Sequence, residues 1–450
     1  MTPTVEIALP EALVKTIQHF APQFWSDLCK VRDFRDPRLI TYPIELELFG
    51  AILFLMLRVG ARRNIKYKLG TPAFIDNLRC LWERFHPGSL ATRQFPETLF
   101  HGDTLHYLLK GIDPEDLHEH LRKPIIKRLL RKRCLEVFRL LGHWYVIAVD
   151  GTGYRAFSER HCEHCLKRKT DRGGIVYLHQ VLEAKLVLPG LGMALSIETE
   201  FIENEAVDVS KQDCEQKAFL RLAKRLKADF PQLNICLAID GLYLSKPMID
   251  VCQKNRWHYI ITFKEGSAPA LFEEYESLLG LTPENALTKR RGDAVANYRW
   301  INDIDWDDRI VHILENREQT PKEEKRFVWG TDFRIDAENV ERVEQDGGRA
   351  RWIIENQGFN VQKNGGYELE HDFSNNNTAM KCFYLLTQIA HIFNQLMEKG
   401  SLLRERIETK LGSLKVLSER LWAALTETRI DPIRLRAILE QRIQIRFDTS

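Results

Sequence analysis

Two aspartates and one glutamate stand at the ends of short apolar runs and are the first candidates for chemistry. Asp150 ends the run WYVIAVD, Asp240 ends ICLAID, and Glu355 ends RWIIE. Runs that are apolar at consecutive positions are typical of strands covered on both faces, so each acid is expected where a strand meets solvent. Ligands of open α/β sheets bind outside the carboxyl ends of such strands. Three carboxylates meeting there could bind Mg²⁺, which prefers oxygen ligands.

Such a site would suit phosphodiester cleavage. Two Mg²⁺ ions about 4 Å apart, or Mn²⁺ in their place, could activate a water molecule and stabilise the leaving oxygen. The acids are 90 and 115 residues apart (240 − 150 and 355 − 240), so only a tertiary fold could bring them together. The alternative is that Asp150-Gly151 and Asp240-Gly241 are ordinary turn pairs. The pattern as a whole indicates a metal-dependent nuclease or transposase.

Composition sets the class of protein. The 450 residues suffice for two or three domains, and 44% hydrophobic and 28% charged residues are ordinary for a globular protein. The net charge of only +2 means that any DNA-binding surface must be local. The apolar run Leu48–Leu57 is shorter than the roughly 20 residues of a membrane span. Without a visible signal peptide, and with nine scattered cysteines, the sequence predicts a cytoplasmic protein without a membrane segment.

The periodicity of the chain predicts how these acids are positioned. Residues 1–142 are expected to form a helical region, 143–280 and 346–400 two parts of an α/β core, 281–345 a β-rich insertion, and 401–450 a helical C-terminal region. In the core we expect strands at 144–149, 174–188, 193–202, 235–239 and 258–263, with helices at 211–230 and 245–255. Three antiparallel strands followed by alternating helices and parallel strands are the order of a ribonuclease-H-like mixed sheet flanked by helices.

The chain resembles a DDE transposase of the insertion-sequence-four type over roughly residues 144–400. The matching stretches are VIAVDGTGY (146–154), LAIDGLYLSKPMIDVCQKNRWHYIITFKEG (237–266) and RWIIENQGFNVQKNGGYELEH (351–371). The resemblance implies a ribonuclease-H-like core with a β insertion, in which Asp150, Asp240 and Glu355 hold two Mg²⁺ ions. It also implies cut-and-paste transposition of an insertion sequence: cleavage of its ends, then strand transfer by the 3′-hydroxyl.

Further functional residues follow from the signature around the glutamate. In this group it lies in a Tyr–Arg–Glu–Lys pattern, with two, three and six residues between the members. Arg351 and Glu355 fit, whereas Gly348 takes the Tyr position and Gln362 the Lys position, with Lys363 next to it. The resemblance implies that Arg351 and Lys363 contact DNA phosphates. The implied partners are double-stranded DNA, as terminal repeats and target, and a second copy of the chain in a synaptic dimer associated with the nucleoid.

Other DNA contacts are suggested by the residues themselves. Lys127 and Arg131 belong to a run of five basic residues in seven, which could contact phosphates or form a solvated helix face. Trp329, in the insertion, could stack on an extruded base, although a tryptophan there could equally belong to the core. The helical region 1–142 is expected to recognise the terminal repeats.

A pair of cysteines forms a second metal-binding candidate. Cys162 and Cys165 have the spacing of a zinc knuckle, and no second such pair follows. The remaining ligands could be His164, His179 or Cys214. The alternative is two reduced thiols in a loop.

Two other functions fit parts of the pattern. Asp150-Gly151-Thr152 is similar to the strand-end aspartate of haloacid-dehalogenase-type phosphatases, but the second aspartate of that motif is missing because position 152 is threonine. A DNA-binding protein derived from a transposase, with mispositioned carboxylates and no catalysis, would carry the same sequence features.

Overall fold

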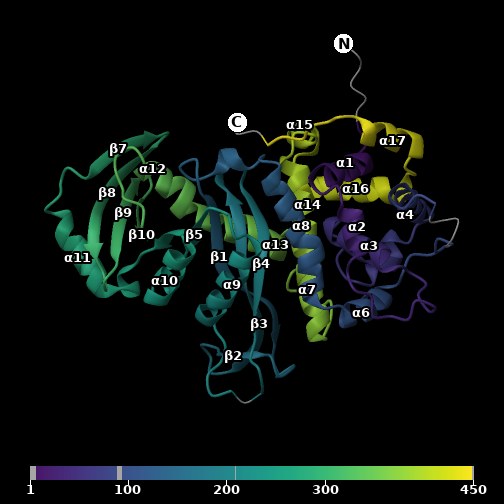
Figure 1. Ribbon diagram of the computed structural model, residues 1–450, viewed down its shortest axis with the longest axis horizontal. Coiled ribbons are helices and arrows are strands. Elements are labelled where there is room, and N and C mark those ends of the chain that lie inside the picture. Colours follow the sequence, from purple (N-terminus) through teal and green to yellow (C-terminus); the bar gives the residue numbers. More distant parts are fainter. Residues whose placement is uncertain (1–6, 89–93, 208, 448–450) are drawn as a thin grey trace, which may run out of the picture.

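A mixed sheet of ten strands runs through the part of the chain that this computed structural model describes, which is residues 7–88, 94–207 and 209–447 (Figure 1). The strand order is β2-β3-β1-β5-β6-β10-β9-β8-β7, and β4 pairs with β3. The strands are β1 (Tyr145–Phe157), β2 (Leu166–Lys169), β3 (Ile175–Leu188), β4 (Met193–Ile202), β5 (Ile235–Ile239), β6 (His258–Thr262), β7 (Ala286–Arg291), β8 (Ala294–Asp305), β9 (Ile310–Gln319) and β10 (Glu324–Thr331).

The core of this sheet has the predicted ribonuclease-H-like order. β4, β3 and β1 are antiparallel neighbours, whereas β1, β5 and β6 are parallel neighbours. The β3–β4 hairpin turns through Pro189–Leu191 and Gly192, whose φ of 61° is a left-handed conformation that glycine adopts without strain. The predicted α/β fold class is therefore confirmed.

The β-rich insertion extends the core sheet. β7, β8, β9 and β10 form antiparallel pairs, and β10 pairs with β6 at three residues, with Trp329 opposite Thr262. β9 continues to Gln319 through a charged stretch that begins at Glu315. Glu315 is fully buried there and stays satisfied because Tyr275 and Arg326 donate hydrogen bonds to its carboxylate.

Helices cover the sheet and form a separate layer beside it. The long helix α14 lies between the sheet and the helical region, and most of its residues are buried because it packs against β4 on one side and α3 and α6 on the other (Figure 1). The helices are α1 (Leu9–Phe20), α2 (Phe24–Leu28), α3 (Ile44–Met56), α4 (Pro72–Phe85), α6 (Gly102–Gly111), α7 (Pro114–Leu117), α8 (Lys123–Arg131), α9 (Glu215–Asp229), α10 (Lys246–Asn255), α11 (Pro269–Leu279), α12 (Val340–Arg342), α13 (Asn360–Asn364), α14 (Asn377–Lys399), α15 (Arg404–Arg406), α16 (Leu414–Glu427) and α17 (Pro432–Glu440).

One sequence-based element needs correction at the site itself. The run Arg351–Glu355 was expected to be a strand, and it is helical. It belongs to a continuous helical segment formed by α12, η7 (Val343–Gly348), η8 (Arg349–Arg351), η9 (Ile354–Phe359) and α13. Val340, Val343, Ala350 and Ile354 are buried at helical spacing, so one face of the segment packs on the sheet.

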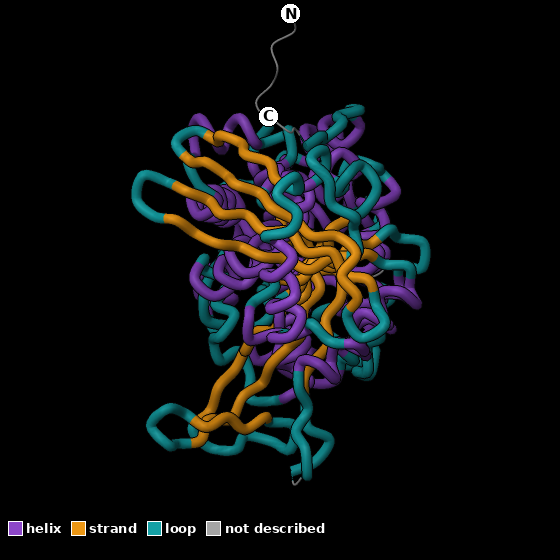
Figure 2. The backbone as a smooth tube through the Cα atoms, turned by 90° about the vertical axis from the view of Figure 1, so that its left-hand side faces the viewer, coloured by secondary structure: helices purple, strands orange, loops and turns teal. Residues whose placement is uncertain are grey.

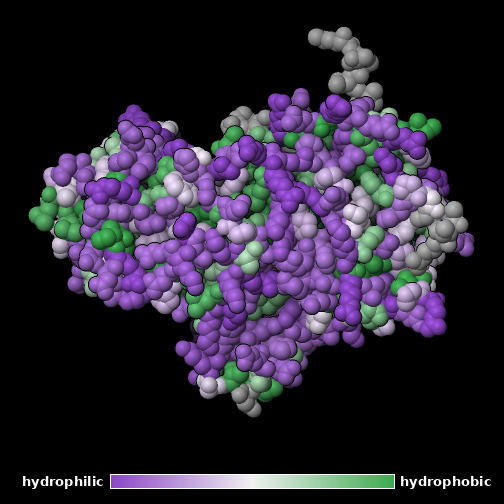
Figure 3. All heavy atoms as spheres, viewed as in Figure 1, coloured by the Kyte–Doolittle hydropathy of each residue, from purple (hydrophilic) through white to green (hydrophobic). Residues whose placement is uncertain are grey.

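Two surface features complete the architecture. The far ends of β1 and β3 and the short β2 project from the body of the molecule as an arm (Figures 1 and 2). On the face shown in Figure 3, hydrophilic residues cover most of the surface and hydrophobic ones occur in small groups. Within the described ranges, no helix combines the length and the apolar character that crossing a membrane requires.

Candidate active site

The two predicted catalytic aspartates lie side by side where two parallel strands part. β1 and β5 are paired with Ala148 opposite Ala238, so Asp150 and Asp240 occupy equivalent positions two residues further on. Neighbouring strands are about 4.8 Å apart. Beyond this point β5 ends, whereas β1 continues as the partner of β3. The parting of the strands places both carboxylates at the kind of sheet edge where α/β proteins bind ligands.

The glycine after each aspartate fixes the carboxylate in the same way. The backbone N–H of Gly151 donates to Oδ1 of Asp150 at 2.9 Å, and that of Gly241 donates to Oδ1 of Asp240 at 2.7 Å. A Cβ on Gly151 would lie 2.2 Å from Oε1 of Glu215, and one on Gly241 would lie 2.5 Å from Oγ of Ser267. Both glycines are therefore needed for close packing around the acids.

The helical segment brings Glu355 and Arg351 to the same strand. Both η8 and η9 pack against β1. A guanidinium nitrogen of Arg351 lies 3.3 Å from Oδ2 of Asp150, and the side chain is largely buried. Glu355 is exposed, one turn further along. The three predicted acids thus come from two neighbouring strands and one helical segment, and not from three strand ends, because β1 continues past Asp150 and only β5 ends at its aspartate.

A fourth carboxylate, which sequence reasoning missed, joins this group. Glu215 is the first residue of α9, its carboxylate packs on Gly151, and it accepts a hydrogen bond of 2.9 Å from the hydroxyl of Tyr243. An acid in the first turn of a helix is common because it complements the helix dipole, so no sequence signal marked this one. Burial is the largest cause of the raised pKa of Tyr243, and the negative charges of Glu215, Asp150 and Asp240 raise it further. The phenol of Tyr243 therefore stays protonated.

The site carries more negative charge than positive charge, with Arg351 beside Asp150 and the carboxylates of Asp240, Glu215 and Glu355 around it. The pKa of Asp150 is raised to about 6, mainly by burial and also by the charges of Glu215 and Glu355, against the opposing effects of Arg351 and the Gly151 N–H. Among the described residues, several groups of Asp, Glu, His and Cys side chains have ligand atoms within 4.8 Å of one another. Asp150, Asp240 and Glu355 do not form such a group. These oxygen donors fit Mg²⁺ in kind.

A second acidic group does not have this character. His118, Glu198 and Asp229 have ligand atoms within 4.8 Å of one another, but all three are buried. Arg122 pairs with Glu198 at 3.4 Å and Lys123 pairs with Asp229 at 2.6 Å. These cations already neutralise the carboxylates, so the group is a buried ionic network of the core.

Trp329, which was considered for base stacking, is a core residue. Only 2% of its surface is exposed, and it packs between β10 and the helical segment. A Cβ on Gly348 would lie 2.6 Å from two atoms of the indole ring. The base-stacking prediction is therefore wrong, because the face of the ring is covered. The same contact leaves no room for a larger side chain at position 348, because the indole occupies that space.

The two residues considered at the predicted lysine position, Gln362 and Lys363, differ in burial. Gln362 is fully buried, and its amide donates to Oε1 of Gln388 at 2.8 Å. Lys363, the next residue of α13, is partly exposed and pairs with Glu370 at 2.7 Å. Of the two neighbours, only Lys363 can reach a phosphate.

The basic residues of α8 lie far from the carboxylates. The ammonium group of Lys127 stands 5.9 Å from the ring centre of Phe230, which caps the C-terminal end of α9, whereas Glu215 begins that helix. A helix of 15 residues is about 22 Å long, so Lys127 lies roughly that far from the acids. Arg131 is exposed at the end of α8.

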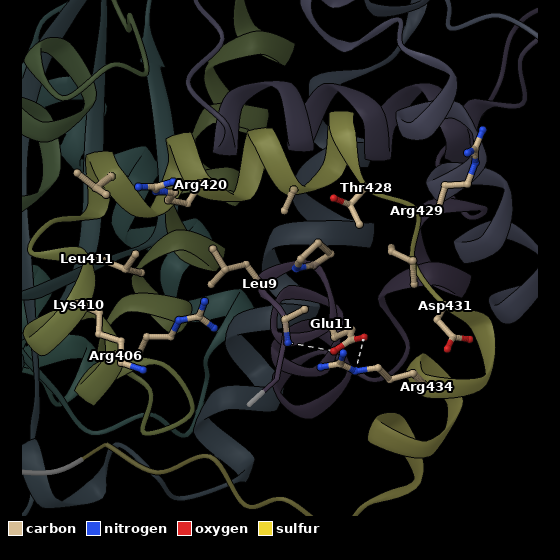
Figure 4. Close-up of a pocket in the computed structure, with 15 residues that line it drawn as sticks. Leu9, Glu11, Arg406, Lys410, Leu411, Arg420, Thr428, Arg429, Asp431 and Arg434 are labelled. Atoms are coloured by element: carbon tan, nitrogen blue, oxygen red, sulfur yellow. Dashed lines mark hydrogen bonds and ion pairs between the residues drawn. The ribbon is translucent and has the colours of Figure 1, made fainter. Parts of the chain in front are cut away.

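A separate pocket of about 630 Å³ lies in the helical region (Figure 4). The start of α1, α16 and the start of α17 surround it, and Glu11 points into it and pairs with Arg434 at 3.1 Å. None of the predicted catalytic acids lines this pocket. It therefore plays no part in the candidate active site.

The predicted zinc ligands Cys162 and Cys165 lie in the segment between β1 and β2, beside His179 of β3. Cys162 and Cys165 are joined there by His161 and His179. His164 and Cys214, which were also considered, do not belong to this group.

Comparison of the whole chain with protein-family models and with curated protein sequences gives no match in either case.

Proposed function

We propose that the protein is a DNA transposase of the DDE type, similar to the insertion-sequence-four group, which cuts the ends of an insertion sequence and joins them to target DNA. One observation carries the proposal: Asp150 and Asp240 stand in register where two parallel strands part, and a helical segment against the same strand carries Glu355. A phosphodiester is negatively charged and is repelled by a cluster of carboxylates. Such a cluster can therefore promote attack by water only when it binds divalent cations.

Each residue has a role in this proposal. Asp150, Asp240 and Glu355 hold two Mg²⁺ ions, or Mn²⁺ in their place, which supply the positive charge that lowers the barrier to attack on phosphorus. Arg351 neutralises Asp150 before metal binds and stabilises the phosphate oxygens afterwards, because its planar fork suits phosphate. Glu215 and Tyr243 hold the wall of the site beside Gly151.

DNA binding in this proposal uses several local surfaces. Lys363 contacts the backbone near the cut, whereas Lys127 and Arg131 contact it about 20 Å away, a span of roughly six base pairs at 3.4 Å each. Two copies of the chain hold the two ends in a synaptic complex. Such a protein would be found with the nucleoid in the cytoplasm.

The test is strand cleavage of DNA that carries the flanking ends of the element, with Mg²⁺ or with EDTA. Asp150→Asn, Asp240→Asn and Glu355→Gln keep side-chain size but remove the negative charge, so each should lower cleavage by at least about a hundredfold. Glu323→Gln, an exposed acid in the β9–β10 turn, is the matched control and should cut normally.

Each other result selects a different function. DNA binding without any Mg²⁺-dependent cleavage by the wild-type protein would favour a transposase-derived binding protein. Hydrolysis of small phosphoesters without DNA binding would favour a phosphatase. Normal cleavage by one of the three variants would remove that residue from the catalytic set.

A further inference from the structure

Four side chains that bind soft or borderline metals meet at the root of the projecting arm. The Sγ atoms of Cys162 and Cys165 are 3.7 Å apart, and Nε2 of His179 lies 3.5 Å from the first and 3.4 Å from the second. His161 completes the group, because one ligand atom from each of the four residues lies within 4.8 Å of all the others. Three of these residues come from the segment after β1 and the fourth from β3.

These distances match those of a tetrahedral zinc site. Zinc binds sulfur at about 2.3 Å and imidazole nitrogen at about 2.05 Å, so ligands at tetrahedral angles are about 3.75 Å apart for two sulfurs and about 3.6 Å for sulfur and nitrogen. The observed separations of 3.7, 3.5 and 3.4 Å agree within 0.2 Å. A disulfide would instead need the two sulfurs about 2.05 Å apart.

The surroundings hold the ligands in place and leave buried imidazole nitrogens of both histidines without a hydrogen-bond partner among the described residues. The ring of His161 stacks on that of Phe157 at 4.4 Å, and its Nδ1 is buried without a hydrogen-bond partner in the described part of the chain. His179 and Cys165 are fully buried. A buried imidazole nitrogen with no partner is costly, and binding to a metal would satisfy it.

The neighbouring histidine is already committed elsewhere. Nδ1 of His164 lies 3.0 Å from the backbone oxygen of Asn204, and the side chain of Asn204 donates to the backbone oxygen of Cys165 at 2.8 Å. These contacts fasten the loop to the end of β4 and aim the Cys165 side chain at the group. They also explain why His164 is not a ligand although it lies between the two cysteines in the sequence.

We propose that His161, Cys162, Cys165 and His179 bind one structural Zn²⁺ ion. Four protein ligands close the tetrahedron, so no open position for a substrate remains, as in structural zinc sites. The ion ties the loop 158–165 to β3 and thereby sets the direction of β2. The exposed Lys167, Arg168 and Lys169 of β2 depend on this anchor for their position.

Metal analysis of the purified chain tests the proposal. Zinc measured by mass spectrometry should reach about one ion per chain. Replacement by Co²⁺ should give the visible absorption bands of a tetrahedral site with thiolate ligands. Cys162→Ser, Cys165→Ser, His161→Ala and His179→Ala should each lower the zinc content severalfold. His164→Ala and Cys214→Ser are the matched controls and should keep full zinc.

A measurement on the wild-type protein guards against variants that fail to fold. A mercurial reagent that blocks thiols should release the zinc in proportion to the modification of two cysteines. Wild-type protein that is purified under reducing conditions and binds no zinc would overturn the proposal, as would a Cys162–Cys165 disulfide under those conditions. Full zinc content in the Cys165→Ser or His179→Ala variant would overturn it equally.

Discussion

At the scale of residues, the site depends on backbone that approaches the acids closely. Asp150 and Asp240 are each followed by a glycine whose N–H binds the carboxylate and whose missing side chain leaves room for a neighbour. The Asp-Gly pairs therefore act as more than turn formers. β1 continues straight through Asp150, and only β5 ends at its aspartate.

Gly151→Ala should disturb this arrangement. Its Cβ would lie 2.2 Å from Oε1 and 2.5 Å from Cδ of Glu215, so the carboxylate must move. We expect a loss of about 1–3 kcal/mol in the free energy of unfolding and a fall of tenfold or more in Mg²⁺-dependent cleavage. Gly153→Ala on the same strand is the control, since its nearest contact is 4.0 Å away. Equal behaviour of the two variants in denaturant melts and cleavage assays would contradict the prediction.

At the scale of elements, the sequence predicted the core strands well and the Glu355 segment badly. Long apolar strands such as β3 and β4, with a Pro-Gly turn between them, leave little ambiguity. RWIIE is only five residues long, and an apolar run of that length does not distinguish a buried strand from a helix. A longer window would have shown Val340, Val343, Ala350 and Ile354 at helical spacing. Contacts that span the fold, such as Glu215 on Gly151, had no local signal at all.

The contact between this helical segment and β10 gives a test of the packing. Gly348→Ala places a methyl group 2.6 Å from the indole of Trp329 and should cost about 1–3 kcal/mol of unfolding free energy. Trp329→Phe removes the indole nitrogen with which this methyl group would clash. The double variant should therefore lose about 1 kcal/mol less unfolding free energy than the sum of the two single losses. The measurement is a double-mutant cycle in denaturant.

The control for this cycle is the neighbouring glycine. A Cβ on Gly347 would meet Ile260, at 2.2 Å, and not Trp329. Gly347→Ala combined with Trp329→Phe should therefore be close to additive. Additive losses for the Gly348 pair would show that the indole does not limit the size of residue 348.

At the scale of the whole molecule, a buried lysine opposes folding. Lys185 is fully buried, and its ammonium group donates to Oε1 of Gln388 at 2.6 Å. Burial lowers the pKa of Lys185 to about 8, despite the opposing charge of Glu183. Below pH 8 the lysine is charged in both states, and the folded protein carries the full penalty. Between about pH 8 and 10.4 the unfolded chain binds more protons, so stability rises with pH.

Lys185→Met should therefore stabilise the protein at pH 7, by up to about 3 kcal/mol, and the gap should close as the pH approaches 10. Gln388 remains satisfied because Gln362 also donates to its Oε1. Urea melts of both proteins across this pH range measure the effect. Lys254→Met, on the exposed face of α10, should show no such dependence. A variant that is less stable than the wild type at every pH would refute the prediction.

The order of strands also has a consequence for how the chain reaches its native state. The outer parts of the sheet are hairpins and meanders between strands close in sequence, whereas β1 meets β5 across 90 residues, with Tyr145 opposite Ile235, and β6 meets β10 across 67, with Trp329 opposite Thr262. Closing long loops is entropically costly, so these central joints form slowly. The carboxylates lie at the β1–β5 joint. We therefore expect refolding chains to acquire the geometry of the candidate site late, after most of their strand structure has appeared.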